Sequence, residues 1–379
     1  MMVMSRSTRR GKHILILSPY FYSKGGIERV VNTHFNILRK RHKVVVLCYG
    51  DNYSVERYPN GLVITLREDL NLFRNPINLL YLIFLHLLLI WADVVFVHEP
   101  NPFASSVYAR LNRRYKKKTL IIYHSDIVKS GVAYLFKRFY QLTFQKLLFT
   151  QSHLILPTTK RYVYVSDTLF YWIPKIRVLP NTIDVSQFTC RKGKEFYKEK
   201  LHLPKDKPVI LTVGRLVPYK GYPIMLDALR KLNRTDYEYY IIGDGPLRKE
   251  ISNKIKKFGL EGVVHLLGKI SDSQLRDYYC AADIFVLPSV MRSEAFGIVL
   301  VEAMASGCAV ITTDVSGTAE VVDGAGLVVP VGDSVHLAKA LSLLLDNPRL
   351  INFYSKKAVK RAKLFDHDRI QDTLFSIVE

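Results

Sequence analysis

Short apolar runs rich in β-branched residues alternate along the chain with stretches in which apolar residues recur at helical spacing. This alternation is typical of parallel sheets whose strands are joined by helices. In the first half of the chain we expect strands at 13–19, 43–49, 94–100 and 119–126. In the second half we expect strands at 208–216, 237–245, 263–270, 284–289 and 308–314. The pattern therefore predicts an α/β protein with two successive Rossmann-like units.

The series of strands is interrupted once, by a stretch rich in lysine and polar residues that contains Pro204 and ends at Pro208. A length of 379 residues is typical of two domains. We therefore expect an N-terminal domain over 1–183, a linker over 184–207 and a C-terminal domain over 208–364. Residues 365–379 are expected to form a C-terminal helix that packs back toward the N-terminal domain.

The formal net charge of +22 is distributed unevenly. Residues 1–190 hold 27 Lys and Arg against 10 Asp and Glu, whereas residues 191–379 hold 28 against 23. A one-sided positive field attracts nucleic acid, an anionic membrane surface or a phosphorylated substrate. Because the sequence contains no recognisable nucleic-acid-binding module, we expect no nucleic-acid partner.

The stretch 135–149 places Lys137, Arg138 and Lys146 among phenylalanine, tyrosine and leucine residues. This composition suits a helix that lies in a lipid headgroup layer. A core-packing helix with a solvated basic face is the alternative. The first interpretation predicts an anionic inner-membrane surface as a partner.

The longest apolar run, 79–91, is shorter than the ~20 residues needed to cross a bilayer and is interrupted by His86. We expect a buried helix or a membrane-dipping segment there. The apolar run at 14–17 is too short for the core of a signal peptide. These features favour a cytoplasmic protein that associates peripherally with the inner face of the cytoplasmic membrane.

The four cysteines, Cys48, Cys190, Cys280 and Cys308, show no paired spacing. Neither a disulfide framework nor a zinc site is predicted. A reducing compartment is therefore expected.

Two glutamates flank a predicted helix start in the second half of the chain. A strand ends near Leu287, Glu294 lies on the loop that follows, and a helix begins near Ile298 and includes Glu302. The first turn of a helix presents unpaired N–H groups and a positive dipole end, which suit a diphosphate. Glu302 is then placed to accept both hydroxyls of a ribose, and Glu294 to bind a second polyol.

Two cations follow the first strand of the same half. Arg215 and Lys220 lie in the loop 214–222, where they can stabilise the negative charge of a leaving nucleoside diphosphate. Acidic clusters at metal-ligand spacing are absent from the sequence, and so is an Asp-x-Asp motif after a strand. We therefore expect no metal, because the cations and the helix dipole can neutralise the diphosphate.

The segment 294–302, EAFGIVLVE, resembles the glutamate-x7-glutamate motif of a large family of retaining GT-B glycosyltransferases. This family, of the family-four type, includes bacterial lipopolysaccharide, capsule and phosphatidylinositol mannosyltransferases. The continuation at 305–322 and the loop 214–222 are also similar to the family's motifs. The resemblance implies the GT-B fold, in which two Rossmann-like domains face each other across a cleft.

The resemblance also implies roles for individual residues. Catalytic roles fall on His124, Glu294, Arg215 and Lys220. The donor-binding residues would be Gly25, Gly26, Arg215, Lys220, Gly243, Lys269, Ile270, Glu294, Ala295, Phe296, Gly297, Ile298 and Glu302. The acceptor side would be formed by His124 and by Asp126, which is placed to orient it.

Some of these positions also have a simpler explanation. Gly25 and Gly26 allow a backbone to approach a phosphate closely, but they also suit a plain turn. The loop at Gly243 has arginine at position 248 where a dinucleotide-binding fingerprint has its third glycine, so NAD binding is disfavoured. Asn181 and Thr182 depart from the family pattern, in which a glycine is common.

The resemblance therefore predicts a retaining, metal-independent hexosyltransferase that needs no cofactor besides its nucleotide-sugar donor. GDP-mannose is the first choice of donor because HSDI and SEAFGIVLVEAMASG look most like O-antigen mannosyltransferases. A UDP-sugar of glucose, galactose or GlcNAc is the alternative, and a nucleotide-sugar 2-epimerase is another. The expected acceptor is a membrane-anchored glycolipid in O-antigen, lipopolysaccharide or capsule synthesis.

Overall fold

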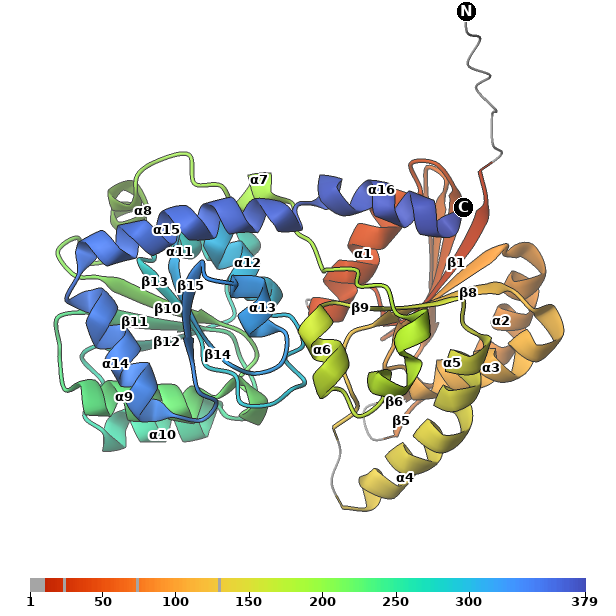
Figure 1. Cartoon of the computed structure of the whole chain (residues 1–379), viewed down its shortest axis with the longest axis horizontal. Helices are drawn as coiled ribbons and strands as arrows, with labels where there is room; N and C mark the ends of the chain where they lie inside the picture. The colour runs from red at the N-terminus through yellow and green to blue at the C-terminus, as the bar shows by residue number, and fades with distance from the viewer. Residues whose placement is uncertain (1–10, 23–24, 73–74, 129–130) are drawn as a thin grey trace, which may run out of the picture. The chain divides into compact units, whose positions relative to one another are not determined.

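The computed structural model describes residues 11–379 except 23–24, 73–74 and 129–130. The chain divides into two compact units (Figure 1). The first unit comprises Met1–Pro157, Thr168–Val178 and Gln371–Glu379. The second unit comprises Thr158–Asp167 and Leu179–Ile370.

The first unit is built on a seven-stranded sheet in the order β3-β4-β2-β1-β7-β8-β9. The described pairings are parallel except that β3 runs antiparallel to β4. The strands are β1 (His13–Tyr20), β2 (Lys43–Gly50), β3 (Ser54–Tyr58), β4 (Gly61–Arg67), β7 (Val94–Glu99), β8 (Lys118–Tyr123) and β9 (Leu154–Pro157). A separate hairpin pairs β5 (Leu70–Leu72) with β6 (Asn75–Ile77).

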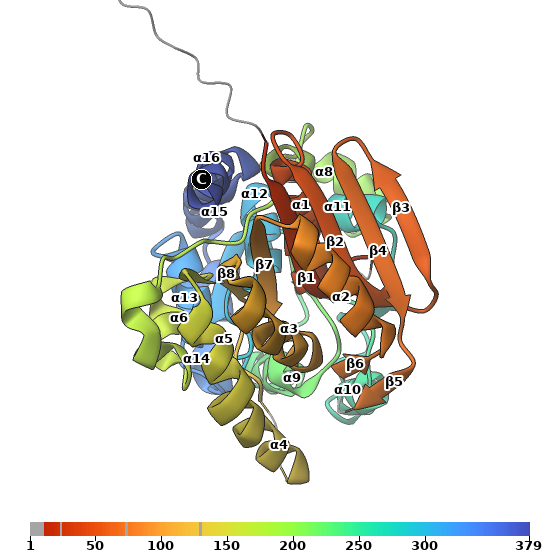
Figure 2. The same ribbon diagram turned by 90° about the vertical axis from the view of Figure 1, so that its right-hand side faces the viewer.

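Helices surround this sheet, and Figure 2 shows α2 and α3 on the side that faces the viewer. A continuous helical stretch begins with α4 and passes through a π-helical turn, η1, into α5. The helices are α1 (Gly26–Leu38), α2 (Leu80–Trp91), α3 (Pro102–Tyr115), α4 (Val132–Tyr140), η1 (Gln141–Gln145), α5 (Lys146–Gln151), η2 (Leu169–Lys175) and the end of α16 (His367–Val378).

The second unit is built on a six-stranded parallel sheet in the order β12-β11-β10-β13-β14-β15. The strands are β10 (Val209–Val213), β11 (Glu238–Ile242), β12 (Val264–Gly268), β13 (Ile284–Leu287), β14 (Ala309–Thr313) and β15 (Gly326–Val329). Two buried apolar clusters lie on its two faces. The two units therefore have the α/β architecture that the sequence predicts.

One face of the second sheet is covered by α9 (Tyr222–Leu232), α10 (Arg248–Lys257) and α14 (Ser334–Leu345). The other is covered by α8 (Lys194–Lys200), α11 (Asp272–Ala281), α12 (Ile298–Ala305) and α15 (Pro348–Ala362). Shorter elements are α6 (Lys160–Val165), α7 (Val185–Phe188), η3 (Pro218–Lys220), α13 (Thr318–Val322) and η4 (Lys363–Phe365).

The linker predicted at 184–207 is instead an ordered part of the second unit. Helices α7 and α8 form within it and pack against α12 and α11. The Nζ atoms of Lys194 and Lys198 each lie 3.1 Å from a carboxylate oxygen of Asp283. The predicted domain boundary is also wrong at 158–167, because this segment belongs to the second unit. The C-terminal helix is shared, since residues 371–379 pack within the first unit.

The cysteine spacing predicted no disulfide, and this prediction is also wrong. Cys190, which follows α7, is bonded to Cys280 of α11, 90 residues away. Cys48 and Cys308 are free and buried. Spacing along the chain could not reveal the bond because folding brings the two segments together.

The apolar run at 79–91 forms α2, which is buried along one stripe only. Tyr81, Leu85 and Leu89 are fully buried, whereas Ile83 and Leu87 are each 57% exposed. The expectation of a buried helix therefore holds for only part of its surface. Among the described residues, no helix is long and apolar enough to cross a bilayer.

Candidate active site

The loops that follow β10 and β13 meet at the carboxyl edge of the second sheet, because these two strands are neighbours. The backbone N–H of Val290 donates to the carbonyl of Tyr219 at 2.8 Å. Gly221 has φ of +72°, and a Cβ at this position would lie 1.8 Å from the carbonyl oxygen of Pro288. Only glycine fits there, so the close packing of the two loops depends on it.

This packing brings Lys220 and Glu294 into a buried ion pair. The Nζ atom of Lys220 lies 2.5 Å from Oε2 of Glu294, and the side chains are 10% and 11% exposed. The hydroxyl of Ser289 donates to the same carboxylate oxygen at 3.1 Å. Burial acts to lower the pKa of Lys220, but the Glu294 carboxylate outweighs it, so the pKa is raised above its ordinary value. Lys220 is therefore charged at neutral pH.

Arg215 lies on the same loop and is exposed. Within the described ranges it forms no ion pair, so its guanidinium is available to an anion. The preceding Gly214 has φ of +155°, and a Cβ on Gly243 would lie 2.0 Å from the Gly214 carbonyl oxygen. The loop after β11 can therefore approach the loop after β10 this closely only because position 243 is glycine.

Helix α12 begins immediately after Gly297, which has φ of +77° and makes no side-chain cap hydrogen bond. The N–H groups of its first turn are therefore not occupied by a capping side chain. Glu302 lies on this helix with 1% exposure and accepts a hydrogen bond from the Tyr279 hydroxyl at 2.8 Å. The predicted role of Glu302 in ribose binding requires this buried carboxylate to become accessible.

The remaining predicted donor residues lie around these loops. Ala295 and Phe296 are buried in the loop before α12, and the Phe296 ring packs edge-on against Phe365 at 5.5 Å. Its side chain is thus part of the core, which leaves the backbone for a ligand. Lys269 is exposed after β12, whereas Ile270 and Ile298 are half-buried.

Gly25 and Gly26 lie in the first unit at the start of α1. Gly25 is the N-cap residue with an extended backbone, and Gly26 is the first residue of the helix. The helix start has no side-chain cap hydrogen bond. This geometry agrees with either a phosphate-binding helix start or a plain turn.

In the first unit, His124 follows β8 and is 8% exposed. Its Nε2 lies 2.9 Å from Nδ1 of His98, a fully buried residue on the adjacent strand β7. Burial lowers the pKa of His124 to about 3 and also holds the pKa of His98 well below its ordinary value. Both imidazoles are therefore neutral near pH 7.

Asp126 follows His124 by two residues, and its role in orienting His124 remains a prediction. Its carboxylate accepts a hydrogen bond from the Tyr123 hydroxyl at 2.6 Å, and it is 2% exposed. Within the described part of the chain, the residue that holds the His124 ring is His98. Whether His124 and Asp126 bind an acceptor remains a prediction.

The sequence analysis also missed Glu99, a fully buried carboxyl group at the end of β7. It accepts hydrogen bonds from the backbone N–H of Asn101 and from the side chains of Ser105, Tyr140 and Gln145. Burial raises its pKa despite these bonds. A glutamate at the end of a mostly apolar strand was the available signal. It ties α3, α4 and η1 to the sheet edge that carries His98.

The residues described in the structure contain no cluster of three or more metal-ligating side chains. Metal independence remains a prediction.

Matching family models cover most of the chain. The model described as Glycosyltransferase Family 4 matches residues 24–187, and that described as Glycosyl transferases group 1 matches residues 193–363. Two domains with parallel sheets and these matches define a glycosyltransferase of the GT-B class.

Similar proteins place it more narrowly. The N-acetylgalactosamine-N,N'-diacetylbacillosaminyl-diphospho-undecaprenol 4-alpha-N-acetylgalactosaminyltransferase of Campylobacter jejuni is 33% identical, covering 93% of this chain and 95% of that protein. O-antigen chain mannosyltransferase C of Escherichia coli is 29% identical, covering 75% and 74%. The structure of Anabaena HepE with UDP and glucose has a TM-score of 0.79 at 20% identity, covering 97% and 99%. The chain belongs to glycosyltransferase family 4.

Proposed function

We propose that this glycosyltransferase moves a hexose from a nucleoside diphosphate sugar to a glycolipid, with retention of anomeric configuration. The observation that carries the proposal is the second unit's edge, where Arg215, the buried Lys220–Glu294 pair and the open start of α12 come together. Cations and a helix start suit a diphosphate, and a carboxylate suits a sugar hydroxyl. The donor therefore binds to the second unit.

The leaving group accounts for this arrangement. As the bond between C1 of the sugar and the diphosphate oxygen breaks, negative charge grows on the diphosphate. Arg215 and Lys220 stabilise that charge, together with the N–H groups at the α12 start, more strongly than they stabilise the intact donor. In a front-face displacement, the departing phosphate oxygen takes the proton of the acceptor hydroxyl. The oxygen of that hydroxyl bonds to C1 on the face from which the phosphate leaves.

The proposed donor is GDP-mannose, supported by the similarity to an O-antigen mannosyltransferase. A UDP-sugar is the alternative, favoured by the likeness to a protein solved with UDP and glucose. The name of the Campylobacter relative specifies an N-acetylgalactosaminyltransferase, so an N-acetylhexosamine is included among the alternatives.

The proposed acceptor is a membrane-anchored glycolipid, such as a polyprenyl-diphosphate-linked oligosaccharide in O-antigen or capsule synthesis. The name of the Campylobacter relative specifies a diphospho-undecaprenol acceptor. Such an acceptor places the enzyme peripherally on the inner face of the cytoplasmic membrane, where the basic first unit is drawn to anionic lipid.

The helices of the first unit support this membrane association. The sequences of α2, α3, α4, η1 and α5 contain no Asp or Glu. Large apolar side chains are nevertheless exposed on α2, α4 and η1, and exposed apolar surface of this kind marks interaction sites. We call these side chains the apolar helical surface: Leu80, Leu82, Ile83, Leu87, Ile90, Tyr134, Leu135, Phe136, Phe139 and Leu142.

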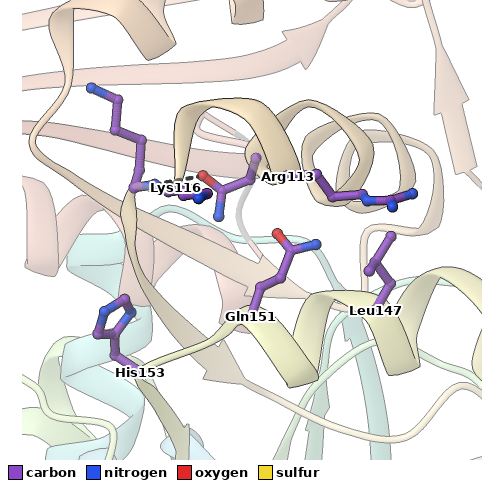
Figure 3. A pocket seen from close by; sticks show the side chains of 7 residues that line it. Arg113, Lys116, Leu147, Gln151 and His153 are labelled. Atoms are coloured by element: carbon purple, nitrogen blue, oxygen red, sulfur yellow. Dashed lines mark hydrogen bonds between the residues drawn. The ribbon is translucent and has the colours of Figure 1, made fainter.

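Basic residues gather elsewhere on the helical part of the first unit. A cavity of ≈ 530 Å³ lies between the end of α3 and α5, lined in part by Arg113, Lys116, Lys117 and His153 (Figure 3). Burial and the nearby Lys118 and Lys175 lower the pKa of His153. Cations and exposed apolar side chains within the same unit suit an anionic headgroup layer, which would accept both.

A nucleotide screen tests the donor assignment. GDP, UDP, ADP and dTDP are added in turn, and the melting temperature is recorded, because a ligand that binds only the folded state raises it. The proposal predicts the largest rise with GDP. If GDP left the melting temperature unchanged and UDP raised it strongly, the UDP-sugar alternative would replace GDP-mannose.

Turnover then separates a transferase from a nucleotide-sugar 2-epimerase. With GDP-mannose and a polyprenyl-diphosphate glycolipid, a transferase releases GDP rapidly only when the acceptor is present. An epimerase converts a UDP-sugar without any acceptor. Acceptor-independent turnover would contradict the proposed reaction.

A further inference from the structure

Two histidines at the carboxyl ends of neighbouring strands contact each other through their ring nitrogens. His98 Nδ1 and His124 Nε2 lie 2.9 Å apart, with ring centroids 5.1 Å apart and planes inclined by 29°. Because the strands pair in register, with His98 opposite Ile122, the contact is built into the sheet. The position of each imidazole ring therefore depends on the other.

The contact allows only one proton between the two nitrogens. A neutral imidazole has one N–H donor and one acceptor nitrogen, so either His98 donates to His124 or His124 donates to His98. Protonation of both facing nitrogens would set two donors against each other. The two arrangements give His124 opposite properties at its other nitrogen, Nδ1.

The surroundings of His98 distinguish these arrangements. Its Nε2 is buried and has no hydrogen-bond partner among the residues that the structure describes. The neighbouring ring is that of His34, whose centroid lies 5.6 Å away. A buried N–H without a partner is rarer than an unsatisfied acceptor, so the proton of His98 is favoured on Nδ1. His98 is then the donor and His124 Nε2 the acceptor.

We propose that His98 is a positioning residue that holds His124 as the tautomer protonated on Nδ1, so that His124 serves as a neutral hydrogen-bond donor to a substrate oxygen and not as a base. This inference rests on the proposed function, and on the substrate-facing role that the family resemblance implies for His124. The Nε2 lone pair of His124 is occupied by His98 and cannot accept the proton of the acceptor hydroxyl. That proton must leave by another route, which the departing phosphate provides.

Two substitutions of His98 separate positioning from simple space filling. Asparagine can place its amide N–H near the former Nδ1 and donate to His124, whereas leucine fills the space without a donor. We expect His98→Leu to lower kcat about 100-fold, since loss of orientation by about 1 Å has that effect. His98→Asn should recover most of the activity. Equal losses in both variants would overturn the proposal.

The tautomer is measured directly from imidazole ¹⁵N chemical shifts in histidine-labelled protein. In the unaltered enzyme, Nδ1 of His124 should carry the proton and Nε2 should not. In His98→Leu the proton should move in part to Nε2. A proton on Nε2 in the unaltered enzyme, or a tautomer unchanged in His98→Leu, would overturn the inference.

Further variants separate this inference from the proposed function. Full turnover by His124→Gln would refute the catalytic placement of His124, whereas an inactive His124→Gln together with a fully active His98→Leu would refute the positioning role alone. His42→Leu removes another buried imidazole, one that accepts the backbone N–H of Lys12. His42→Leu should lose about as much free energy of unfolding as His98→Leu, but its kcat should equal that of the unaltered enzyme. A comparable fall in its kcat would show a general folding effect and overturn the positioning role.

Discussion

At the scale of single residues, the pairing of Lys220 with Glu294 links stability to catalysis. Both side chains are about nine-tenths buried, and the Ser289 hydroxyl supports the same carboxylate oxygen. A buried charge that loses its partner is strongly destabilising, whereas removing both charges costs much less. The pair therefore contributes both to the stability of the fold and to catalysis, and substitutions can separate these two contributions.

Lys220→Met is expected to lower kcat by about 10²–10³-fold, as does the loss of one charge-stabilising group in other active sites. It should also lower the free energy of unfolding by about 3–5 kcal/mol, because Glu294 is left buried and unpaired. The double variant Lys220→Met/Glu294→Gln should regain much of that stability but not the activity. Denaturant titration and initial rates check both parts, and a double variant no more stable than the single one would contradict the pairing argument.

The buried histidines predict a dependence of stability on pH. The pKa of His124 in the folded protein is about 3, below the value of about 6.5 expected after unfolding. The unfolded chain therefore binds more protons as pH falls, and stability present above pH 6.5 is lost toward pH 3. The raised pKa of Glu99 acts in the opposite sense.

Substitution isolates the histidine contribution, because Glu99 is unchanged. As pH falls from 6.5 to 5, a single histidine of this kind should lower the free energy of unfolding by about 2 kcal/mol. Between pH 7 and pH 5, His124→Gln should therefore lose about that much less stability than the unaltered protein. Parallel curves for the two proteins would mean that His124 already takes up its proton in the folded state.

At the scale of elements, the disulfide fixes the segment that was expected to be a linker. The Cys190–Cys280 bond joins the end of α7 to α11, and Lys194 and Lys198 of α8 pair with Asp283. A bond that closes a loop of this length typically contributes about 2–4 kcal/mol. The second unit thus depends on the oxidation state of its cysteines.

Removal of this bond by Cys190→Ser is expected to lower the melting temperature by roughly 4–16 °C, at about 2–4 °C for each kcal/mol. Reductant should have the same effect on the unaltered protein and none on the variant. Thiol titration after denaturation should find two reactive thiols without reductant and four with it, in line with the Cys48 and Cys308 thiols. Four thiols without reductant would show that the bond is absent.

The apolar helical surface gives α2 a testable role. Leu87→Glu places a charge on a side chain that is 57% exposed, so folding should tolerate it while membrane insertion should not. Sedimentation with vesicles of phosphatidylglycerol and phosphatidylethanolamine should show severalfold weaker binding. Leu343→Glu on α14, at a side chain 50% exposed in the second unit, is the matched control. Equal binding by both variants would contradict the role of α2.

The elements also show where sequence patterns suffice. Strands with continuous apolar runs, such as β1, β10 and β14, were predicted because both faces of a central parallel strand are buried. β4, β9 and β15 were missed, since they are short or interrupted by polar residues. The contact between His98 and His124 was missed for another reason. It depends on strand neighbours that only the fold reveals.

At the scale of the whole molecule, the uneven charge of the sequence coincides with the division into two units. The helices α2, α3, α4, η1 and α5 of the first unit contain no acidic residue, and α3, α4 and α5 carry Lys or Arg. The second unit instead carries the paired charges around Asp283 and Glu294. Salt screens the attraction between these basic residues and anionic lipid, because the Debye length is only about 10 Å at 0.1 M ionic strength. Vesicle binding should therefore weaken as salt is raised, while nucleotide binding to the second unit should change much less.

Arg215 offers the most direct test of where the donor binds, because it is exposed and its loss should not disturb folding. GDP and UDP binding are measured by calorimetry for the unaltered protein, Arg215→Met and Lys249→Met, the last a change of an exposed lysine on α10. The account predicts affinity about 10- to 100-fold weaker for Arg215→Met, the range for a lost hydrogen bond to a charged group, and unchanged for Lys249→Met. Equal nucleotide affinity in all three proteins would show that the diphosphate lies elsewhere.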